Sequence, residues 1–338
     1  MRPIAISLLL SLLLSPAAAA ALKPAWAGGE RLPPSAPLVG EVENFGPNLS
    51  NDCPFTEGVA VDPQGNVYAS SFAFAPTAWI CVLDRFGGLT GRLAVAAGPA
   101  GVASLLGMLF VPSEGLYVTD FADGMPGHGR LLLVDVATGA SEVVASGFTA
   151  PNALARDAWK RIYVSDSFEG RIYRVDRRRG EVLGWAESPL LRTTGQPPFG
   201  ANGLAFDRAS RFLYVANTGD SAVLRIPVQR SGAAGPVETF AQGGQQTGLL
   251  WGADGIQFDV RGNLWVCANQ ANEIQVLSPA GALLARIAGQ GDAAFDFPAS
   301  LVFKGRELFV VNLSLGTGGV NSKVLEIDAA WPGAPLRP

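Results

Sequence analysis

The chain has 338 residues, of which 48% are hydrophobic and 16% are charged, and its net charge at pH 7 is −4. A slightly acidic chain is a poor candidate for nucleic-acid binding, because phosphate contacts need clustered Lys and Arg, and the high apolar content argues against intrinsic disorder. The 41 Gly and 24 Pro argue against coiled coils and helical bundles and favour short strands joined by tight turns.

The first predicted element is an export signal and its cleavage region, within residues 1–27. A positively charged start is followed by an apolar run over residues 4–14 and then by small residues, which is the pattern of a signal peptide. The run is shorter than the roughly 20 residues of a membrane span. Residues 18–20 and 25–27 compete as cleavage sites, and an uncleaved anchor is the alternative. We therefore expect an exported protein, periplasmic or extracellular, with no membrane span in the mature chain.

A repeat of about fifty residues occupies the rest of the chain. One aromatic strand residue recurs every 44 to 51 residues, at Tyr68, Tyr117, Tyr163, Tyr214, Trp265 and Phe309. The end of a later strand recurs with similar spacing, at Asp84, Asp135, Asp176, Pro227, Ser278 and Asp328. Each unit has room for four antiparallel strands and their turns. Six such units predict an all-β fold, a six-bladed β-propeller.

The ring of blades must close, because each repeat buries its apolar face only against its neighbours. The sixth unit ends with its third strand at Asp328, and a strand-like segment at Leu38 to Phe45 precedes the first unit. We expect this N-terminal strand to complete the sixth blade and to remove a free sheet edge. The predicted organisation is one propeller over residues 38–330, between a loose linker at 28–37 and a loose tail at 331–338.

Polar side chains recur directly before the first strand of the blades, at one mouth of the predicted central channel. In chain order the residues at this position are Glu57, Leu106, Asn152, Asn202, Asp254 and Ser300. Two carboxylates held close together raise a pKa or require a cation. Oxygen ligands with two negative charges suit Ca²⁺, with Mg²⁺ or Mn²⁺ as alternatives, and the lack of His and Cys at these positions argues against zinc. The structural alternative is that Asn and Asp cap turns.

The same residues resemble the regucalcin–gluconolactonase family of six-bladed propellers. The matching pieces are Glu57-Gly58-Val59-Ala60-Val61-Asp62, Pro151-Asn152, Ala201-Asn202-Gly203-Leu204-Ala205-Phe206-Asp207, and Ala253-Asp254-Gly255 followed by Gly262-Asn263-Leu264-Trp265-Val266. The resemblance implies a Ca²⁺-type ion on Glu57, Asn202 and Asp254, with Asn152 as a further ligand or a substrate contact. It also implies hydrolysis of lactones or related esters. Members that act on sugar lactones often carry Arg where this chain has Ala150, which argues against a sugar substrate.

Other residues near the same mouth are candidates for substrate contacts. The loops after the second strands begin at polar residues that include Asp120, Asp166, Asn217 and Asn312, and aromatic residues such as Phe199 and Trp251 precede the ring position. The aromatic residues either line an apolar substrate pocket or pack between blades. Asp254 is the candidate general base, because it is a carboxylate beside the predicted ion. The one histidine, His128, is expected to be a solvated loop residue.

Three cysteines allow one disulfide in an exported protein. Cys53 and Cys81 both fall near the predicted mouth in the first blade and form the expected pair, whereas Cys267 lies in a strand-like run and is expected to be a small buried hydrophobe. The sequence thus predicts a monomeric, metal-dependent hydrolase of a small-molecule lactone or ester. A non-catalytic propeller that binds a ligand or a protein, and a lyase or synthase on the same scaffold, are the alternatives.

Overall fold

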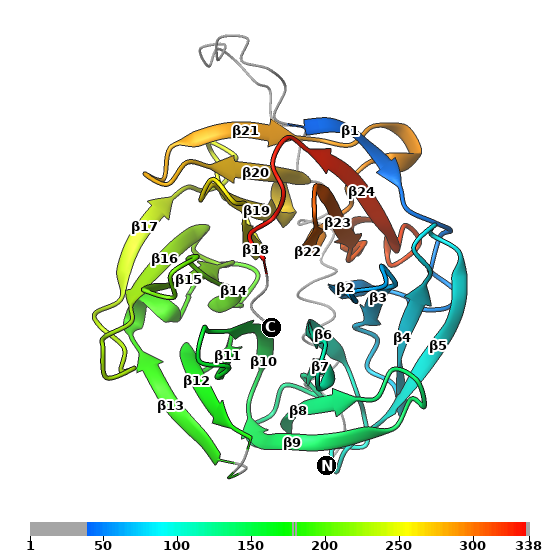
Figure 1. Cartoon of the computed structure of the whole chain (residues 1–338), viewed down its shortest axis with the longest axis horizontal. Helices are drawn as coiled ribbons and strands as arrows, with labels where there is room; N and C mark the ends of the chain where they lie inside the picture. Colours follow the sequence, from blue (N-terminus) through cyan, green and yellow to red (C-terminus); the bar gives the residue numbers. More distant parts are fainter. Residues whose placement is uncertain (1–38, 178, 180, 336–338) are drawn as a thin grey trace.

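The computed structural model describes residues 39–177, 179 and 181–335, which form six four-stranded antiparallel sheets around a common centre (Figure 1). The innermost strands are β2 (Thr56–Val61), β6 (Leu105–Val111), β10 (Pro151–Arg156), β14 (Ala201–Phe206), β18 (Ala253–Phe258) and β22 (Pro298–Lys304). The second strands are β3 (Val67–Ser71), β7 (Gly115–Asp120), β11 (Ile162–Asp166), β15 (Phe212–Asn217), β19 (Leu264–Ala268) and β23 (Glu307–Asn312). The predicted six-bladed propeller is confirmed.

The outer half of each blade follows in chain order. The third strands are β4 (Thr77–Leu83), β8 (Gly129–Val134), β12 (Arg171–Asp176), β16 (Ala222–Pro227), β20 (Glu273–Leu277) and β24 (Lys323–Ala329). The outermost strands are β5 (Leu89–Ala96), β9 (Ser141–Phe148), β13 (Glu181–Glu187), β17 (Glu238–Gln242), β21 (Leu283–Ile287) and β1 (Val39–Asn44). The helical segments of the described residues are single 3₁₀ turns, η1 (Pro189–Leu191), η2 (Asn269–Ala271), η3 (Gly291–Ala293) and η4 (Leu315–Thr317).

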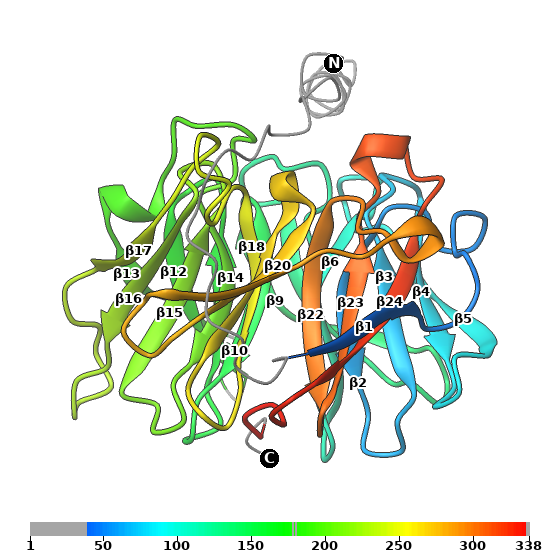
Figure 2. The ribbon, with the colours of Figure 1, turned by 90° about the horizontal axis from the view of Figure 1, so that it is seen from above.

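The N-terminal strand closes the ring, as the sequence predicts. β1 pairs antiparallel with β24, with Val42 opposite Ile327 and Asn44 opposite Leu325, and Figure 2 shows the two strands side by side. The sixth sheet therefore combines both ends of the described chain. The predicted signal peptide and linker lie outside the described residues. Within the described part of the chain, no helix is long and apolar enough to cross a membrane.

Six clusters of the hydrophobic core are each shared between two neighbouring blades. Trp265 of blade five packs with Leu308 of blade six, and Phe309 of blade six packs with Val59 of blade one. The remaining blade pairs share corresponding clusters. Because each blade buries its faces only against its neighbours, the ring is stable as a closed whole. This packing holds the six inner strands at fixed distances around the axis.

The C-terminal segment differs from its prediction. The sequence predicts a loose tail at residues 331–338, but the described part of this tail is bound to the propeller. The backbone N–H groups of Val260, Gly333 and Ala334 donate to the carbonyl oxygens of Pro332, Gly305 and Phe258. The guanidinium of Arg261 lies 4.0 Å from the centre of the Trp331 ring. The prediction of a loose tail is therefore wrong for residues 331–335, since long-range backbone pairing outweighs the local Pro-rich composition.

The first blade contains the disulfide between Cys53 and Cys81, and Cys267 is a buried free thiol. The bridge joins residues 28 apart in the sequence. By the chain-entropy model, a loop of this length stabilises the fold by about 3–4 kcal/mol. We expect reduction with dithiothreitol to lower the free energy of unfolding by this amount in urea titrations. A Cys53→Ala, Cys81→Ala double variant serves as the control, since its stability must not respond to the reductant; a response there, or none in the native chain, contradicts the prediction.

Candidate metal centre

The ring residues are placed by a β-bulge that recurs in every inner strand. In β2, Thr56 pairs with Ser71 and the next pair is Val59 with Ala69, so two residues of β2 face one of β3. The same one-residue irregularity occurs in β6, β10, β14, β18 and β22. Bulges of this kind bend the strand and turn a side chain away from the sheet. The second residue of each inner strand is therefore the ring position: Glu57, Leu106, Asn152, Asn202, Asp254 and Ala299.

The sixth blade departs from the sequence prediction by one residue. The sequence assigns Ser300 to the ring, but the register of β22 and β23 pairs Pro298 with Asn312 and Leu301 with Val310. This register makes Ala299 the equivalent of Glu57, whereas Ser300 is equivalent to Gly58. Gly58 marks a close approach between blades, because a Cβ there would lie 2.1 Å from the carbonyl oxygen of Leu106. The assignment of Ser300 is therefore wrong, and the sixth ring position has no oxygen ligand in its side chain.

The four predicted oxygen ligands meet in one pocket at the channel mouth. Glu57, Asn152, Asn202 and Asp254 all line it, and each side chain has 3 to 5% of its surface exposed. The pocket that they line with their neighbours is small, with a cavity volume of about 30 Å³, where about 10–15 Å³ holds one water molecule. The pocket can thus accept an ion or a small polar group beside the four ligands.

Hydroxyl groups of the neighbouring second strands fix the orientation of the two amides. Ser167 donates to the carbonyl oxygen of Ala201, 2.8 Å away, and accepts from Nδ2 of Asn152, 3.2 Å away. Thr218 donates to a backbone carbonyl in the same way and accepts from Nδ2 of Asn202 at 2.9 Å. Because each hydroxyl hydrogen is already donated, the amide must present its NH₂ group to it. The amide oxygens are therefore the groups left to act as ligands.

The two carboxyl groups are both buried, and the negative charge of Asp254 disfavours ionisation of Glu57. Burial, and secondly the charge of Asp254, raise the pKa of Glu57 well above its usual value. Burial raises the pKa of Asp254 to about 7, although hydrogen bonds from Asn269 and Asn202 act in the opposite direction. Nδ2 of Asn269 donates to Oδ2 of Asp254 at 2.8 Å. Among the described residues, the buried Oε2 of Glu57 finds no hydrogen-bond donor.

These observations fit a hard cation. Burial raises the pKa of both carboxyl groups, the charge of Asp254 raises that of Glu57 further, and one oxygen of Glu57 lacks a partner. Such a pair is stabilised when a positive charge lies between the two groups. Two carboxylates and two amide oxygens match the ligand chemistry of Ca²⁺. In the described part of the chain, no group of three or more His, Cys, Asp or Glu side chains could hold a metal. The candidate centre therefore depends on the two asparagines as well as on the two acids.

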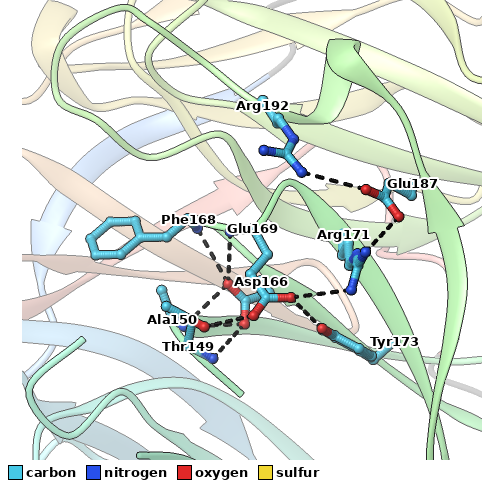
Figure 3. A network of polar contacts seen from close by, with 9 residues as sticks. All are labelled: Thr149, Ala150, Asp166, Phe168, Glu169, Arg171, Tyr173, Glu187 and Arg192. Atoms are coloured by element: carbon cyan, nitrogen blue, oxygen red, sulfur yellow. Dashed lines mark hydrogen bonds and ion pairs between the residues drawn. The ribbon is translucent and has the colours of Figure 1, made fainter. Parts of the chain in front are cut away.

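Asp166 is buried at the end of β11 and binds backbone groups of its own blade (Figure 3). It accepts hydrogen bonds from the N–H groups of Thr149 at 2.8 Å, Ala150 at 3.1 Å, Phe168 at 3.3 Å and Glu169 at 3.1 Å. Burial raises its pKa, against the effect of these hydrogen bonds. Figure 3 shows the Phe168 ring projecting away from this network. These contacts give Asp166 a structural role.

The other predicted polar contacts occupy the same strand position. Asp120 pairs with Arg130 and accepts from the N–H groups of Ser104 and Ala122. Asn217 donates to the carbonyl oxygens of Leu190 and Arg192, and Asn312 donates to that of Ala294. All four residues are fully buried, and none lines the pocket. That these four residues bind a substrate stays a prediction, and their hydrogen bonds within the protein do not support it.

The residue one position later lies nearer the pocket: it lines the pocket in blades one, four, five and six, and in blade three it contacts the ring residue Asn152. These residues are Phe72, Phe121, Ser167, Thr218, Asn269 and Leu313, which follow the last residues of the six second strands. Three are polar and contact a ring residue, as described for Ser167, Thr218 and Asn269. In four blades the sequence prediction chose the preceding residue as the substrate contact, namely Asp120, Asp166, Asn217 and Asn312. The sequence feature that could have identified the later residues is the alternation of side chains along a strand, because consecutive residues point to opposite faces.

Of the two aromatic residues predicted to contact a substrate, one lies at the pocket and one does not. Phe199 lines the pocket together with Phe72 and Phe297, whereas Trp251 does not line it. His128 lies in the loop before β8 with 43% of its side chain exposed, and its Nδ1 is 2.8 Å from Asp123. The histidine is therefore a solvated loop residue, as expected.

Residues 190–313 match the family model of the SMP-30/gluconolactonase/LRE-like region. This range contains Asn202 and Asp254 of the ring together with Thr218 and Asn269. A search of curated proteins with the sequence finds no match.

Solved structures share the fold at low sequence identity. A gluconolactonase from Xanthomonas campestris has a TM-score of 0.62 and 17% identity, covering 85% of this chain and 89% of that chain. A calcium-binding regucalcin from Agrobacterium tumefaciens has a TM-score of 0.61 and 16% identity, covering 86% and 94%. A luciferin-regenerating enzyme has a TM-score of 0.63 and 16% identity, covering 88% and 98%. The resemblance predicted from the sequence is thus confirmed: residues 190–313 carry the SMP-30/gluconolactonase/LRE-like region, within a six-bladed propeller that resembles those of regucalcin and gluconolactonase.

Proposed function

We propose that this protein is a hydrolase of lactones or related esters that depends on a Ca²⁺-type divalent cation at the mouth of the propeller channel. The observation that carries the proposal is the buried pair of Glu57 and Asp254, in which Oε2 of Glu57 has no donor among the described residues. Such a pair is costly without a cation. The likeness to a gluconolactonase supports the reaction class, and the likeness to a calcium-binding regucalcin supports the cation.

The residues that would hold the cation are Glu57 and Asp254 through carboxylate oxygens and Asn152 and Asn202 through amide oxygens. When bound, the ion supplies Lewis-acid polarisation of the substrate carbonyl. Ser167 and Thr218 keep the amide oxygens turned toward the pocket by holding the amide nitrogens. Asn269 restrains Oδ2 of Asp254. The ligand set is thus prepared before a substrate arrives, which lowers the reorganisation needed for the reaction.

Asp254 is the residue that would move a proton. Its Oδ2 accepts from Asn269, so Oδ1 is the atom assigned to the incoming water. Burial holds its pKa near 7, and a nearby cation would lower that pKa and keep the carboxylate ionised at neutral pH. Oδ1 accepts a proton as the water oxygen bonds to the carbonyl carbon. The ring C–O bond then breaks and the leaving oxygen receives the proton, which yields one hydroxy acid from one lactone and one water.

The test is turnover of a panel of lactones and simple esters by purified protein. We expect hydrolysis that is lost in EGTA and restored by added Ca²⁺, with Mg²⁺ and Mn²⁺ compared in parallel. The rate should follow occupancy of one cation per chain, measured by calorimetry. Binding of the cation without turnover of any compound would contradict the enzymatic proposal and favour a non-catalytic binding propeller.

We also propose that the protein is exported and acts as a monomer. The disulfide between Cys53 and Cys81 supports export, because such bonds persist in oxidising compartments and are rare in the cytosol. Fractionation of cells that express the full chain would locate it, and light scattering would give its mass in solution.

A further inference from the structure

An aromatic surface surrounds the candidate metal centre. We name it the mouth cluster; it consists of buried Phe72, Leu106, Phe121, Ala150, Phe199, Ala299 and Leu313, with partly buried Phe55, Phe74, Phe168, Phe297 and Leu315. Its rings touch in sequence from blade one to blade four, with centroid distances of 4.8 Å for Phe72 and Phe74, 5.6 Å for Phe72 and Phe121, and 5.5 Å for Phe121 and Phe168. Phe168 continues to Phe199 at 5.3 Å. The rings therefore form one continuous row over blades one to four.

Three of these phenylalanines adopt a backbone conformation that bulky residues rarely take. The φ angles are 56° at Phe55, 41° at Phe74 and 58° at Phe297. Phe55 and Phe297 both lie two residues before a ring position, and the equivalent residue in blade five is Gly252, with φ of 70°. Glycine adopts this conformation without strain, whereas a phenylalanine is strained there. Strained residues cluster at ligand sites, so an aromatic ring at these two positions points to contact with a ligand.

Outside the candidate metal centre, the pocket offers few free polar groups: among the described residues that line it, Oδ1 of Asn269 is the one further buried side-chain atom without a hydrogen-bond partner. Thr218 donates to a backbone carbonyl, and Nδ2 of Asn269 is bonded to Asp254. Among the described residues that line the pocket, the ionisable side chains are Glu57 and Asp254, and both belong to the candidate metal centre. A substrate with many hydroxyl groups would find few partners above the ring, and each buried hydroxyl without a partner weakens binding.

We infer that the substrate carries an apolar aliphatic or aryl substituent that lies on the mouth cluster while its carbonyl group meets the ring of oxygen ligands. This inference rests on the proposed lactone or ester hydrolysis and specifies its substrate class. The partly buried rings offer the contact surface, and Phe199 and Phe297 line the same small pocket as Glu57 and Asp254, so one molecule can meet both the rings and the oxygen ligands. The protein should therefore prefer substrates whose substituent buries more apolar surface area against the mouth cluster.

The first experiment compares δ-lactones that share one ring and differ in their substituents. Each methylene that is buried on an apolar surface is expected to raise kcat/KM about fourfold until the surface is covered. We expect δ-decalactone, which carries a pentyl chain, to exceed δ-valerolactone by at least tenfold in kcat/KM, with glucono-δ-lactone the poorest of the three. Equal values for the two alkyl lactones, or a preference for glucono-δ-lactone, overturn the inference and leave the proposed hydrolysis intact.

Variants test whether the mouth cluster carries this preference. Phe297→Ala removes a partly buried ring that lines the pocket. It should lower the ratio of kcat/KM for δ-decalactone over δ-valerolactone at least fivefold. Phe240→Ala is the matched control, because Phe240 is a partly buried phenylalanine on the outer strand β17 that packs on Tyr214 at 5.0 Å. A ratio that Phe297→Ala leaves unchanged, or that Phe240→Ala lowers equally, contradicts the assignment. Phe74→Ala provides a second mouth variant should the first fail to fold.

A binding measurement separates this inference from the proposed reaction. δ-Lactams resist hydrolysis, so calorimetry on the Ca²⁺-loaded protein reports binding whether or not any lactone is turned over. The lactam with a pentyl substituent is expected to bind at least tenfold more tightly than δ-valerolactam, with a negative change in heat capacity. Equal affinities overturn the apolar assignment. Tight binding of the pentyl lactam together with no lactone turnover supports the mouth assignment and refutes the reaction alone.

Discussion

Replacing Asp254 with asparagine is expected to lower kcat/KM for lactone hydrolysis at least a hundredfold while the propeller stays folded. A general base contributes about 10² to 10⁴ to the rate, and an amide cannot accept the proton from water. The Asp254→Asn side chain keeps an oxygen for the hydrogen bond from Asn269. Because the substitution also removes one of two opposed buried carboxyl groups, the metal-free fold should not lose stability.

Loss of the base must be distinguished from loss of the cation. The assay is therefore run at saturating Ca²⁺, and the dissociation constant of Ca²⁺ is measured for each variant. Glu57→Gln removes a proposed ligand that is not the base, so high Ca²⁺ should recover more activity in this variant than in Asp254→Asn. Asp220→Asn is the control, since Asp220 is an exposed carboxylate that hydrogen-bonds to Thr193 outside the pocket. Full activity of Asp254→Asn would refute the base assignment.

The metal-free protein is expected to lose stability as the pH rises from about 4 to about 7, and Ca²⁺ should abolish this loss. Folding raises the pKa of Glu57 and raises that of Asp254 to about 7, whereas unfolded carboxyl groups titrate near 4. Between these values the folded state binds more protons, so the free energy of unfolding falls with rising pH. The contribution of Asp254 is fully present below pH 4 and is lost as the pH rises through about 7, and Glu57 acts in the same direction. For Asp254 alone the change amounts to about 4 kcal/mol.

A bound cation abolishes this loss of stability, because it binds the ionised carboxylates and so favours the deprotonated folded state. At a Ca²⁺ concentration of about 1,000 times the dissociation constant, the fold gains about 4 kcal/mol. Urea titrations from pH 5 to pH 8, with and without Ca²⁺, measure both effects. A Glu57→Gln, Asp254→Asn double variant corrects for all other titrating groups, since only the difference from this variant reports the pair. A metal-free difference that is flat or rises over this range would refute the assignment of opposed buried carboxyl groups.

The six blades and most of the candidate centre could be read from the sequence because their signals are local and repeated. Tyr68, Tyr117 and Tyr163 mark equivalent strands, and a recurring strand pattern dictates a recurring fold unit. The ring position carries Glu57 and Asp254 in the same place of two repeats, so closing the ring necessarily brings them to one axis. The N-terminal strand followed from counting strands, since a closed ring leaves no unpaired edge.

What could not be read from the repeat was the direction in which single side chains point. One extra residue at the bulge of β2 points the Glu57 side chain toward the channel. One step along the chain separates Asp166, which binds backbone groups of its blade, from Ser167, which contacts the ring residue Asn152. The same one-residue shift makes Ala299 the sixth ring position in place of Ser300. Successive side chains of a strand point to opposite faces of the sheet. Composition and spacing therefore establish which residues are near the axis, whereas the pairing of strands in the sheet decides which side chains can reach a ligand.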